Sequence, residues 1–274
     1  MNQATRQDVY CSFIVPIRRV QVDPLEVERL ADYFKLLRLA GCEVLIVDGS
    51  PKPIFKEHRK SWQGFSRHIA PDPKYTYLNG KVNGVHTGVD LASCERIILA
   101  DDDIRYRAAD VKRMCKLLDK FEMVRPQNFI APLPWWARLE TARILINRAV
   151  LRAGDYPGTC GFRRSTMRRV GPYDGDVLFD NEEIVRHFAL NGVEINYALD
   201  FFYPQTSSHV YEVVGAASSS GIRRLRNASE DCWFSLGCPA DHRTQFSRQR
   251  ARRDFLFGSG LCVVSISRQS GFVA

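Results

Sequence analysis

Short apolar runs alternate with helix-like segments over the first two hundred residues, and this alternation limits the possible folds more than any other feature of the sequence. Residues 11–17 (CSFIVPI) and 43–50 (EVLIVDGS) are strand-like, and residues 23–41 between them are helix-like. Strands that alternate with helices are typical of a layered sheet with helices packed on it. The sequence therefore predicts an α/β, Rossmann-like fold with a mostly parallel, mixed sheet flanked by helices.

The predicted helices carry signals at their ends or a core-facing period. In residues 23–41, Asp23 is suited to cap the N-terminus, Pro24 fits the first turn and Gly41 follows the last one. Residues 108–121 place apolar side chains at i, i+3, i+4 and i+7, which indicates a helix with one buried face. The other expected elements are a glycine-weakened helix (81–93), a strand (96–100), a strand-like run (128–134), a long helix (near 136–152), a turn-rich stretch (155–165), a helix (about 180–191) and a strand (193–199).

Three consecutive aspartates, Asp101 to Asp103, directly follow the apolar run 96–100. Adjacent carboxylates repel one another and resist burial, so the triplet needs either open water or a cation. The D-x-D spacing of Asp101 and Asp103 lets two carboxylates approach one ion, and oxygen ligands of this kind suit Mg²⁺ or Mn²⁺. A solvated acidic turn, with an aspartate capping a helix, is the alternative. Asp48 ends an earlier strand, and ligands collect at the carboxyl ends of strands in such sheets, so Asp48 and the triplet can share one crevice.

Charge and cysteine content limit the partners and the cellular compartment that we expect for the protein. The net charge of +8 fits an anionic partner such as a nucleotide, a nucleic acid or a membrane surface. The eight cysteines form no C-x-x-C pair, which favours reduced thiols in a cytosolic protein. The N-terminus lacks the pattern of a signal peptide, and no apolar run approaches the roughly 20 residues that cross a bilayer. We therefore expect a cytoplasmic protein.

The alternating pattern stops near Thr206, and residues 206–274 are rich in serine and arginine. Within them, residues 215–221 (GAASSSG) are typical of a loop or linker. We expect one domain over residues 1–205, followed by an irregular C-terminal extension. The arginines of this extension make it a candidate for contact with the inner face of the membrane.

Four segments follow one another in a specific order: CSFIVPI, VLIVDGS, GKVNGVHTGVDLA and IILADDD. In this order they resemble the nucleotide-binding half of GT-A fold glycosyltransferases, particularly family 2 and its relatives. The resemblance covers roughly residues 10–200 and implies a single GT-A-like domain. It implies a nucleotide-sugar half over about 10–105 and an acceptor half over about 106–205.

Carried over residue by residue, the resemblance implies a nucleotide-sugar site formed by Pro16, Ile17, Asp48, Lys81, Asp101 and Asp102. In such a site, Pro16 and Ile17 line the nucleoside pocket, Asp48 hydrogen-bonds the base, and Lys81 lies near the sugar or the diphosphate. Asp101 and Asp103 hold a Mn²⁺ or Mg²⁺ ion that bridges the diphosphate. Such an ion stabilises the charge that develops on a diphosphate leaving group.

The acceptor side is expected from two segments further along the chain. By its position, the stretch 155–165 (DYPGTCGFRRS) resembles the family's glycine-rich segment that faces donor and acceptor, which implies acceptor contacts at Gly158 and Gly161. Trp135 and Trp136 stand at a helix entrance between the metal motif and the base segment, where an acceptor wall would lie. A core role for one of the two tryptophans is the alternative.

A general base is expected at the start of the helix near residue 180. An inverting transferase needs a carboxylate there to take the proton from the acceptor hydroxyl. Alignment with the family places Asp180 and Asn181 where an acidic pair is expected, and asparagine cannot act as a base. The candidates are therefore Glu182, which we favour, then Asp180, and Glu183. Acids at this position also suit the positive end of a helix without any catalytic role.

The resemblance thus implies a metal-dependent hexosyltransferase that moves a sugar from a UDP- or GDP-sugar to an acceptor hydroxyl, with inversion. The acceptor class (glycan, lipid or small molecule) stays open. The Gln-x-x-Arg-Trp signature of processive members is absent, which favours a non-processive enzyme. The alternatives are a sugar-phosphate nucleotidyltransferase, disfavoured because no glycine cluster follows the first strand, and a non-enzymatic binder of anions or nucleic acid. Acids at strand ends do not suit such a binder, so no nucleic-acid partner is expected.

Overall fold

The computed structural model describes residues 9–135, 137–151, 154–155 and 157–206. These residues form a seven-stranded sheet in the order β3-β2-β1-β4-β6-β5-β7. Strand β6 runs antiparallel to its neighbours β4 and β5, while the other four neighbouring pairs are parallel. The strands are β1 (Cys11–Ile17), β2 (Cys42–Asp48), β3 (Arg67–Ile69), β4 (Arg96–Ala100), β5 (Met123–Ile130), β6 (Thr159–Arg163) and β7 (Ile195–Gln205). The predicted α/β fold with a mostly parallel, mixed sheet is confirmed.

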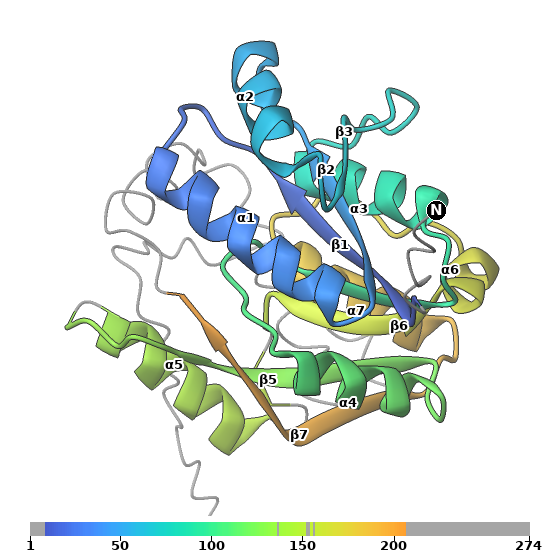
Figure 1. Cartoon of the computed structure of the whole chain (residues 1–274). Helices are drawn as coiled ribbons and strands as arrows, with labels where there is room; N and C mark the ends of the chain where they lie inside the picture. Colours follow the sequence, from blue (N-terminus) through green and yellow to red (C-terminus); the bar gives the residue numbers. More distant parts are fainter. Residues whose placement is uncertain (1–8, 136, 152–153, 156, 207–274) are drawn as a thin grey trace, which may run out of the picture. The chain divides into compact units, whose positions relative to one another are not determined.

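Helices cover both faces of this sheet (Figure 1). One hydrophobic core joins α1, α2 and α4 to the strands, and a second joins α3, α6 and α7 to the opposite face. Strand β1 contributes to both, because Phe13 and Val15 belong to the first core and Ile14 to the second. The helices are α1 (Pro24–Leu39), α2 (Lys52–Trp62), α3 (Gly80–Leu91), α4 (Ala108–Leu118), α5 (Ala137–Val150), α6 (Arg164–Val170) and α7 (Asp180–Leu190).

Helix α1 begins and ends where the sequence predicts. The Asp23 side chain accepts hydrogen bonds from the backbone N–H groups of Leu25 and Glu26, at 3.0 and 3.4 Å. These bonds satisfy two of the donors that the first turn leaves open. Gly41 follows the helix with a φ of 86°, a backbone conformation that side chains with a Cβ rarely adopt.

The glycines of helix α3 let it lie close to the sheet. A Cβ at Gly88 would lie 2.5 Å from Cγ2 of Ile14 in β1, and a Cβ at Gly84 would lie 3.1 Å from Cβ of Pro16. The helix therefore uses glycine for close packing, although glycine lowers its intrinsic helix propensity. This packing brings Lys81, in the first turn of α3, to the end of the strands.

The strand expected over 128–134 begins and ends earlier, as β5 (Met123–Ile130), and two other parts of the chain differ from the expectations. No element was predicted between residues 51 and 80, where the structure contains α2 and β3. The stretch 155–165, expected to be turn-rich, contains β6, which pairs with β4 from Arg96↔Arg163 to Ala100↔Thr159. Both partners of β6 and the helices on each face bury it, so neighbours in the sheet outweigh the low strand propensity of its glycine.

In the described residues, no helix is long and apolar enough to span a membrane. The predicted extension 206–274 lies outside the described residues except for Thr206.

Candidate active site

A cleft of about 1010 Å³ opens at the carboxyl ends of β1, β2 and β4. Pro16 and Ile17 line it at the end of β1, Val47 and Gly49 at the end of β2, and the aspartate triplet at the end of β4. The crevice expected from the sequence is therefore present, and five of the six predicted nucleotide-sugar residues line it. The five are Pro16, Ile17, Lys81, Asp101 and Asp102.

The aspartate triplet forms a tight turn after β4. The backbone N–H of Asp101 donates to the carbonyl of Gly158 at 2.8 Å, and the N–H of Ile104 donates back to the carbonyl of Asp101 at 3.1 Å. The buried side chain of Ile104 fixes the end of this turn. Each of the three carboxylates has a different set of neighbours.

Asp101 is held by a lysine. Nζ of Lys81 lies 2.6 Å from Oδ1 of Asp101 and 2.9 Å from Oδ2 of Asp180, and it also donates to Oδ1 of Asn181 at 3.0 Å. Burial raises the pKa of Asp101, and Lys81 opposes that rise. Burial lowers the pKa of Lys81, but the two carboxylates outweigh it, so the net pKa of the lysine is raised and the ammonium stays charged. One ammonium thus links the triplet to the start of α7.

Asp102 is paired with Arg19, which follows β1. The guanidinium of Arg19 donates to Oδ2 of Asp102 and also to Glu26, with 2.5 Å between Nη2 and Oε1 of Glu26. Arg19 is therefore placed between an acid of the triplet and an acid of α1. Burial raises the pKa of Asp102, and the nearby arginine opposes that rise.

Asp103 is the triplet member with spare bonding capacity. Its Oδ2 accepts a hydrogen bond from Nε2 of Gln205 at 2.7 Å, but its buried Oδ1 has no hydrogen-bond partner among the described residues. Burial, reinforced by Asp101, raises the pKa of Asp103 to about 6. A buried carboxylate oxygen without a donor is costly, and a divalent cation would satisfy it. Asp101 and Asp103 therefore fit a Mg²⁺ or Mn²⁺ site.

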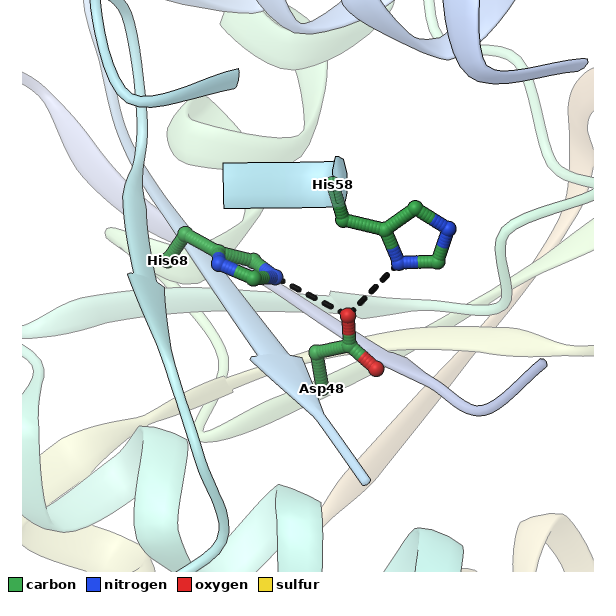
Figure 2. Close-up of side chains that lie close together, drawn as sticks. All are labelled: Asp48, His58 and His68. Carbon is green, nitrogen blue, oxygen red and sulfur yellow. Dashed lines mark hydrogen bonds and ion pairs between the residues drawn. The ribbon is translucent and has the colours of Figure 1, made fainter. Parts of the chain in front are cut away.

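Asp48 lies at the end of β2, but its side chain is buried and points toward α2 and β3. Its Oδ2 lies 2.7 Å from Nδ1 of His58 and 2.9 Å from Nε2 of His68 (Figure 2). Its Oδ1 accepts the backbone N–H of Ser50 at 2.8 Å. Asp48 does not line the cleft, although its neighbours Val47 and Gly49 do. The resemblance-implied contact between Asp48 and a base stays a prediction.

The acceptor residues fall into different environments. Gly158 packs against Asp101 so closely that a Cβ there would collide with the Asp101 carboxylate. Gly161 faces α4, where a Cβ would lie 2.6 Å from Sδ of Met114. Trp135 is 74% exposed before α5, and Pro134 next to it lines the cleft. Trp136 lies outside the described residues.

The three acids at the start of α7 also differ. Asp180 is buried and reaches Lys81 in the cleft. Glu183 is buried and pairs with Arg186 on its own helix, at 2.7 Å. Glu182, the favoured base, is half-buried in the first turn. The structure therefore brings Asp180 and the unfavoured Asn181 to the aspartate triplet.

Sequence reasoning missed several polar residues of the site. Arg19 and Gln205 contact the triplet directly, and Arg105 lines the cleft with a hydrogen bond from Nη1 to the carbonyl of Asp102. The only available signal for Arg19 was its place after a strand that ends in Pro16 and Ile17. His58 and His68 stand in the stretch for which no element was predicted, and their spacing carried no signal.

The architecture is similar to that of solved nucleotide-sugar glycosyltransferases. A mannosyltransferase from Pyrobaculum calidifontis, in complex with GDP-Man and Mn²⁺, matches with a TM-score of 0.55 and 16% identity, over 81% of this chain and 64% of the mannosyltransferase. Glucosyl-3-phosphoglycerate synthase from Mycobacterium tuberculosis, in complex with Mn²⁺, UDP and phosphoglyceric acid, matches with a TM-score of 0.51 and 15% identity, over 84% of this chain and 79% of the synthase. This chain therefore spans just under two thirds of the mannosyltransferase.

The sequence itself matches no family model and no curated protein. Identities of this size establish a shared fold. The resemblance that the sequence showed to GT-A glycosyltransferases is thus confirmed for the fold.

Proposed function

We propose that this chain, which has the GT-A fold, is a metal-dependent glycosyltransferase that moves a sugar from a UDP- or GDP-sugar to an acceptor hydroxyl. The observation that carries the proposal is the aspartate triplet at the carboxyl end of β4, where Oδ1 of Asp103 has no partner among the described residues and Lys81 pairs with Asp101. The two solved neighbours hold Mn²⁺ with GDP-Man or with UDP, which supports the same ligand class here. The proposed catalytic domain covers residues 1–205, and its proposed location is the cytoplasm.

Asp101 and Asp103 are the proposed ligands of a Mn²⁺ or Mg²⁺ ion. When bound, such an ion supplies positive charge to the diphosphate leaving group. The charge of the cleft supports this dependence, because the described residues of its lining include equal numbers of basic and acidic side chains and give no excess of positive charge for an anionic diphosphate. The basic residues are Arg18, Arg19, Arg29, Lys81 and Arg105, and the acidic ones are Asp23, Glu26, Asp101, Asp102 and Asp103.

We propose Asp180 as the general base. Successive residues on a helix point about 100° apart, and Asp180 and Asn181 both reach Lys81, so Glu182 points about 150° from the direction midway between them. Glu183 is occupied by Arg186. A general base that activates the acceptor hydroxyl for direct attack on the donor leads to inversion of the anomeric configuration. The absence of the Gln-x-x-Arg-Trp signature supports the transfer of one sugar per binding event.

The first experiment measures donor binding. The full chain is titrated with UDP, GDP and CDP and with their sugar conjugates, each with Mn²⁺ and with EDTA, and the melting temperature is followed. Ligand binding to the native state raises the melting temperature, so we expect a rise with UDP or GDP that EDTA removes. The variant Asp103→Asn should fold and lose this rise. If the native chain shows no rise with any nucleotide, the proposal is wrong.

The second experiment identifies the reaction class from the released product. A glycosyltransferase releases a nucleoside diphosphate from a nucleotide-sugar, whereas a nucleotidyltransferase releases pyrophosphate from a nucleoside triphosphate. Candidate acceptors from the glycan, lipid and small-molecule classes are supplied with the donor that binds, and a parallel reaction supplies a sugar phosphate with UTP or GTP. Release of UDP or GDP that depends on both metal and acceptor supports the proposal, and pyrophosphate release would replace it with the nucleotidyltransferase.

A further inference from the structure

A buried cluster of three titratable side chains lies next to the cleft and has no part in the chemistry described above. Asp48 ends β2, His58 comes from α2 and His68 comes from β3 (Figure 2). The three side chains are at most 1% exposed. Both imidazole rings point at the same carboxylate oxygen, Oδ2 of Asp48, from two different elements.

The hydrogen bonds of the cluster define its protonation. Asp48 accepts three donors, from His58, His68 and the backbone of Ser50, so the carboxylate is ionised. Burial raises the pKa of Asp48, but these hydrogen bonds outweigh burial and hold the pKa well below its usual range. Nδ1 of His68 is buried and has no partner in the described part of the chain, so Nε2 is the ring nitrogen through which His68 contacts Asp48.

Aromatic rings hold both histidines in place. The ring of His58 stacks on Trp62, with centroids 4.4 Å apart and an interplanar angle of 22°. The ring of His68 lies 4.3 Å from that of Phe55. Nε1 of Trp62 donates to the carbonyl of Val27 in α1 at 3.1 Å, which fixes the indole in turn. Both imidazole rings of the cluster are therefore packed against aromatic neighbours.

The spacing of the cluster favours hydrogen bonds over a shared metal ion. The two oxygen–nitrogen separations, 2.7 and 2.9 Å, are those of N–H···O bonds. Two ligands placed about 2.0 to 2.1 Å from one tetrahedral zinc ion are about 3.3 Å apart. Each histidine N–H therefore points at the carboxylate itself.

A continuous series of polar contacts leads from the cluster to the aspartate triplet. Oγ of Ser50 accepts the backbone N–H of Arg19 at 2.8 Å, and the side chain of Arg19 pairs with Asp102. Beside it, the backbone N–H of Gly49 donates to the carbonyl of Ile17 at 2.9 Å. Since Ile17, Arg19 and Gly49 all line the cleft, the cluster fixes the backbone that forms its floor.

We propose that Asp48, His58 and His68 are positioning residues that anchor the floor of the nucleotide cleft, and that Asp48 does not read the nucleobase in this chain. The carboxylate already accepts two buried imidazole N–H donors and one backbone N–H, and turning it into the cleft would leave the two imidazole N–H groups unpaired. This inference rests on the proposed nucleotide binding and differs from the role that the family resemblance implies for Asp48.

The decisive test compares two nucleotides in one variant. UDP and GDP are titrated with Mn²⁺ into the full chain and into Asp48→Asn, by calorimetry. We expect both affinities to fall by a similar factor, about tenfold for one lost charged acceptor, so that the ratio of the two dissociation constants stays constant. A tenfold change in this ratio would mean that Asp48 reads the base, and the inference would be wrong.

A second measurement does not depend on nucleotide binding. Hydrogen exchange of the Ser50 and Arg19 backbone amides is compared between the native chain and Asp48→Asn. We expect faster exchange at both amides, because one loses its charged acceptor and the other loses the fixed hydroxyl of Ser50. Unchanged exchange would overturn the inference. Faster exchange in a chain that binds neither nucleotide would refute the proposed function and leave the anchor supported.

Histidine variants separate hydrogen bonding from packing. Asn at position 58 and Gln at position 68 each keep an N–H donor near the imidazole nitrogen that is used, whereas Leu keeps only bulk. His58→Asn and His68→Gln should therefore bind nucleotide within about threefold of the native chain, and His58→Leu and His68→Leu should lose about tenfold. The matched control is His86→Leu, a buried histidine that contacts the carbonyl of Tyr173 at 3.4 Å and should affect stability without affecting affinity. Native affinity in both leucine variants at 58 and 68 would contradict the inference.

The last measurement is the metal content of the purified protein. If Asp48, His58 and His68 form a hydrogen-bonded anchor, the protein contains no stoichiometric zinc that depends on these three residues. One zinc ion per chain that is lost in Asp48→Asn, His58→Leu and His68→Leu alike would overturn the hydrogen-bonded anchor and identify a metal site instead.

Discussion

Nζ of Lys81 lies 2.6 Å from Oδ1 of Asp101, and this ion pair joins the first turn of α3 to the end of β4. The same ammonium lies 2.9 Å from Oδ2 of Asp180 at the start of α7. The consecutive elements α3 and β4 and the distant helix α7 therefore share one positive charge at the cleft. The lysine predicted to lie near the sugar or the diphosphate is the counter-ion of two acids.

The pair should show measurable coupling. We expect Lys81→Met and Asp101→Asn each to lower the free energy of unfolding, and the double variant to lose about 1 kcal/mol less than their sum, because the side chains are 23% and 26% exposed and solvent screens part of the interaction. Urea denaturation of the four proteins measures this difference. The matched control is the exposed pair Lys74 and Asp90, where Lys74→Met and Asp90→Asn should be closer to additive. Additivity at Lys81 and Asp101 would contradict the prediction.

Gly158 should be sensitive to a single methyl group. A Cβ at this position would collide with Oδ2 of Asp101 and lie 3.0 Å from its Cγ, so Gly158→Ala has to displace a proposed metal ligand. We expect Mn²⁺-dependent nucleotide affinity to fall by about tenfold or more, with overpacking costing about 1–3 kcal/mol of stability. Calorimetry and urea denaturation measure the two effects.

The control for Gly158 is Gly64→Ala, because a Cβ at Gly64 would have no atom of the described residues within 4 Å. It should leave nucleotide affinity unchanged. If Gly158→Ala binds nucleotide as the native chain does, Asp101 is not held in the position on which the metal site depends.

The fold could be predicted from the sequence because its signals are local. The apolar run before Asp48, the cap at Asp23 and the glycine after α1 each act within a few residues, so their pattern is visible without the tertiary structure. Strand β6 was not predicted, because its place between β4 and β5 compensates for a sequence with glycine and turn residues. Such compensation depends on neighbours that are distant in the chain.

The site was partly predictable for the same reason. Asp101 and Asp103 follow a strand, so their place at the carboxyl end of the sheet was evident from the sequence, and the structure places them in the cleft. The partners of Asp48 were not evident, because His58 and His68 come from a helix and a short edge strand in a region with no clear period. The direction in which Asp48 points is decided by these partners, and only the folded structure brings them together.

The stability of the cluster should depend on pH in a defined direction. The pKa of Asp48 is held well below its usual range, so the native state binds fewer protons there than the unfolded state. Its contribution is therefore fully present above the unfolded pKa of about 3.9 and is lost progressively as the pH falls through that value toward the folded pKa. We expect the difference in unfolding free energy between the native chain and Asp48→Asn to shrink from pH 5 to pH 3. Urea denaturation at several pH values measures it, and a difference that stays constant over this range would contradict the lowered pKa.

The base can be identified by comparing isosteric variants of the three acids of α7. Asp180 reaches Lys81 in the cleft, Glu183 pairs with Arg186, and Glu182 lies on another side of the helix. We expect Asp180→Asn to lower kcat by about 10² to 10⁴ while donor affinity changes little, since a general base acts on the acceptor and contributes about this factor. Glu182→Gln should keep most of the activity, and Glu183→Gln should mainly lower stability. Initial rates with the donor identified by thermal shift measure these effects. If Glu182→Gln lost the activity and Asp180→Asn kept it, the base favoured by the sequence would be the correct one, and α7 would have to present its other side to the acceptor.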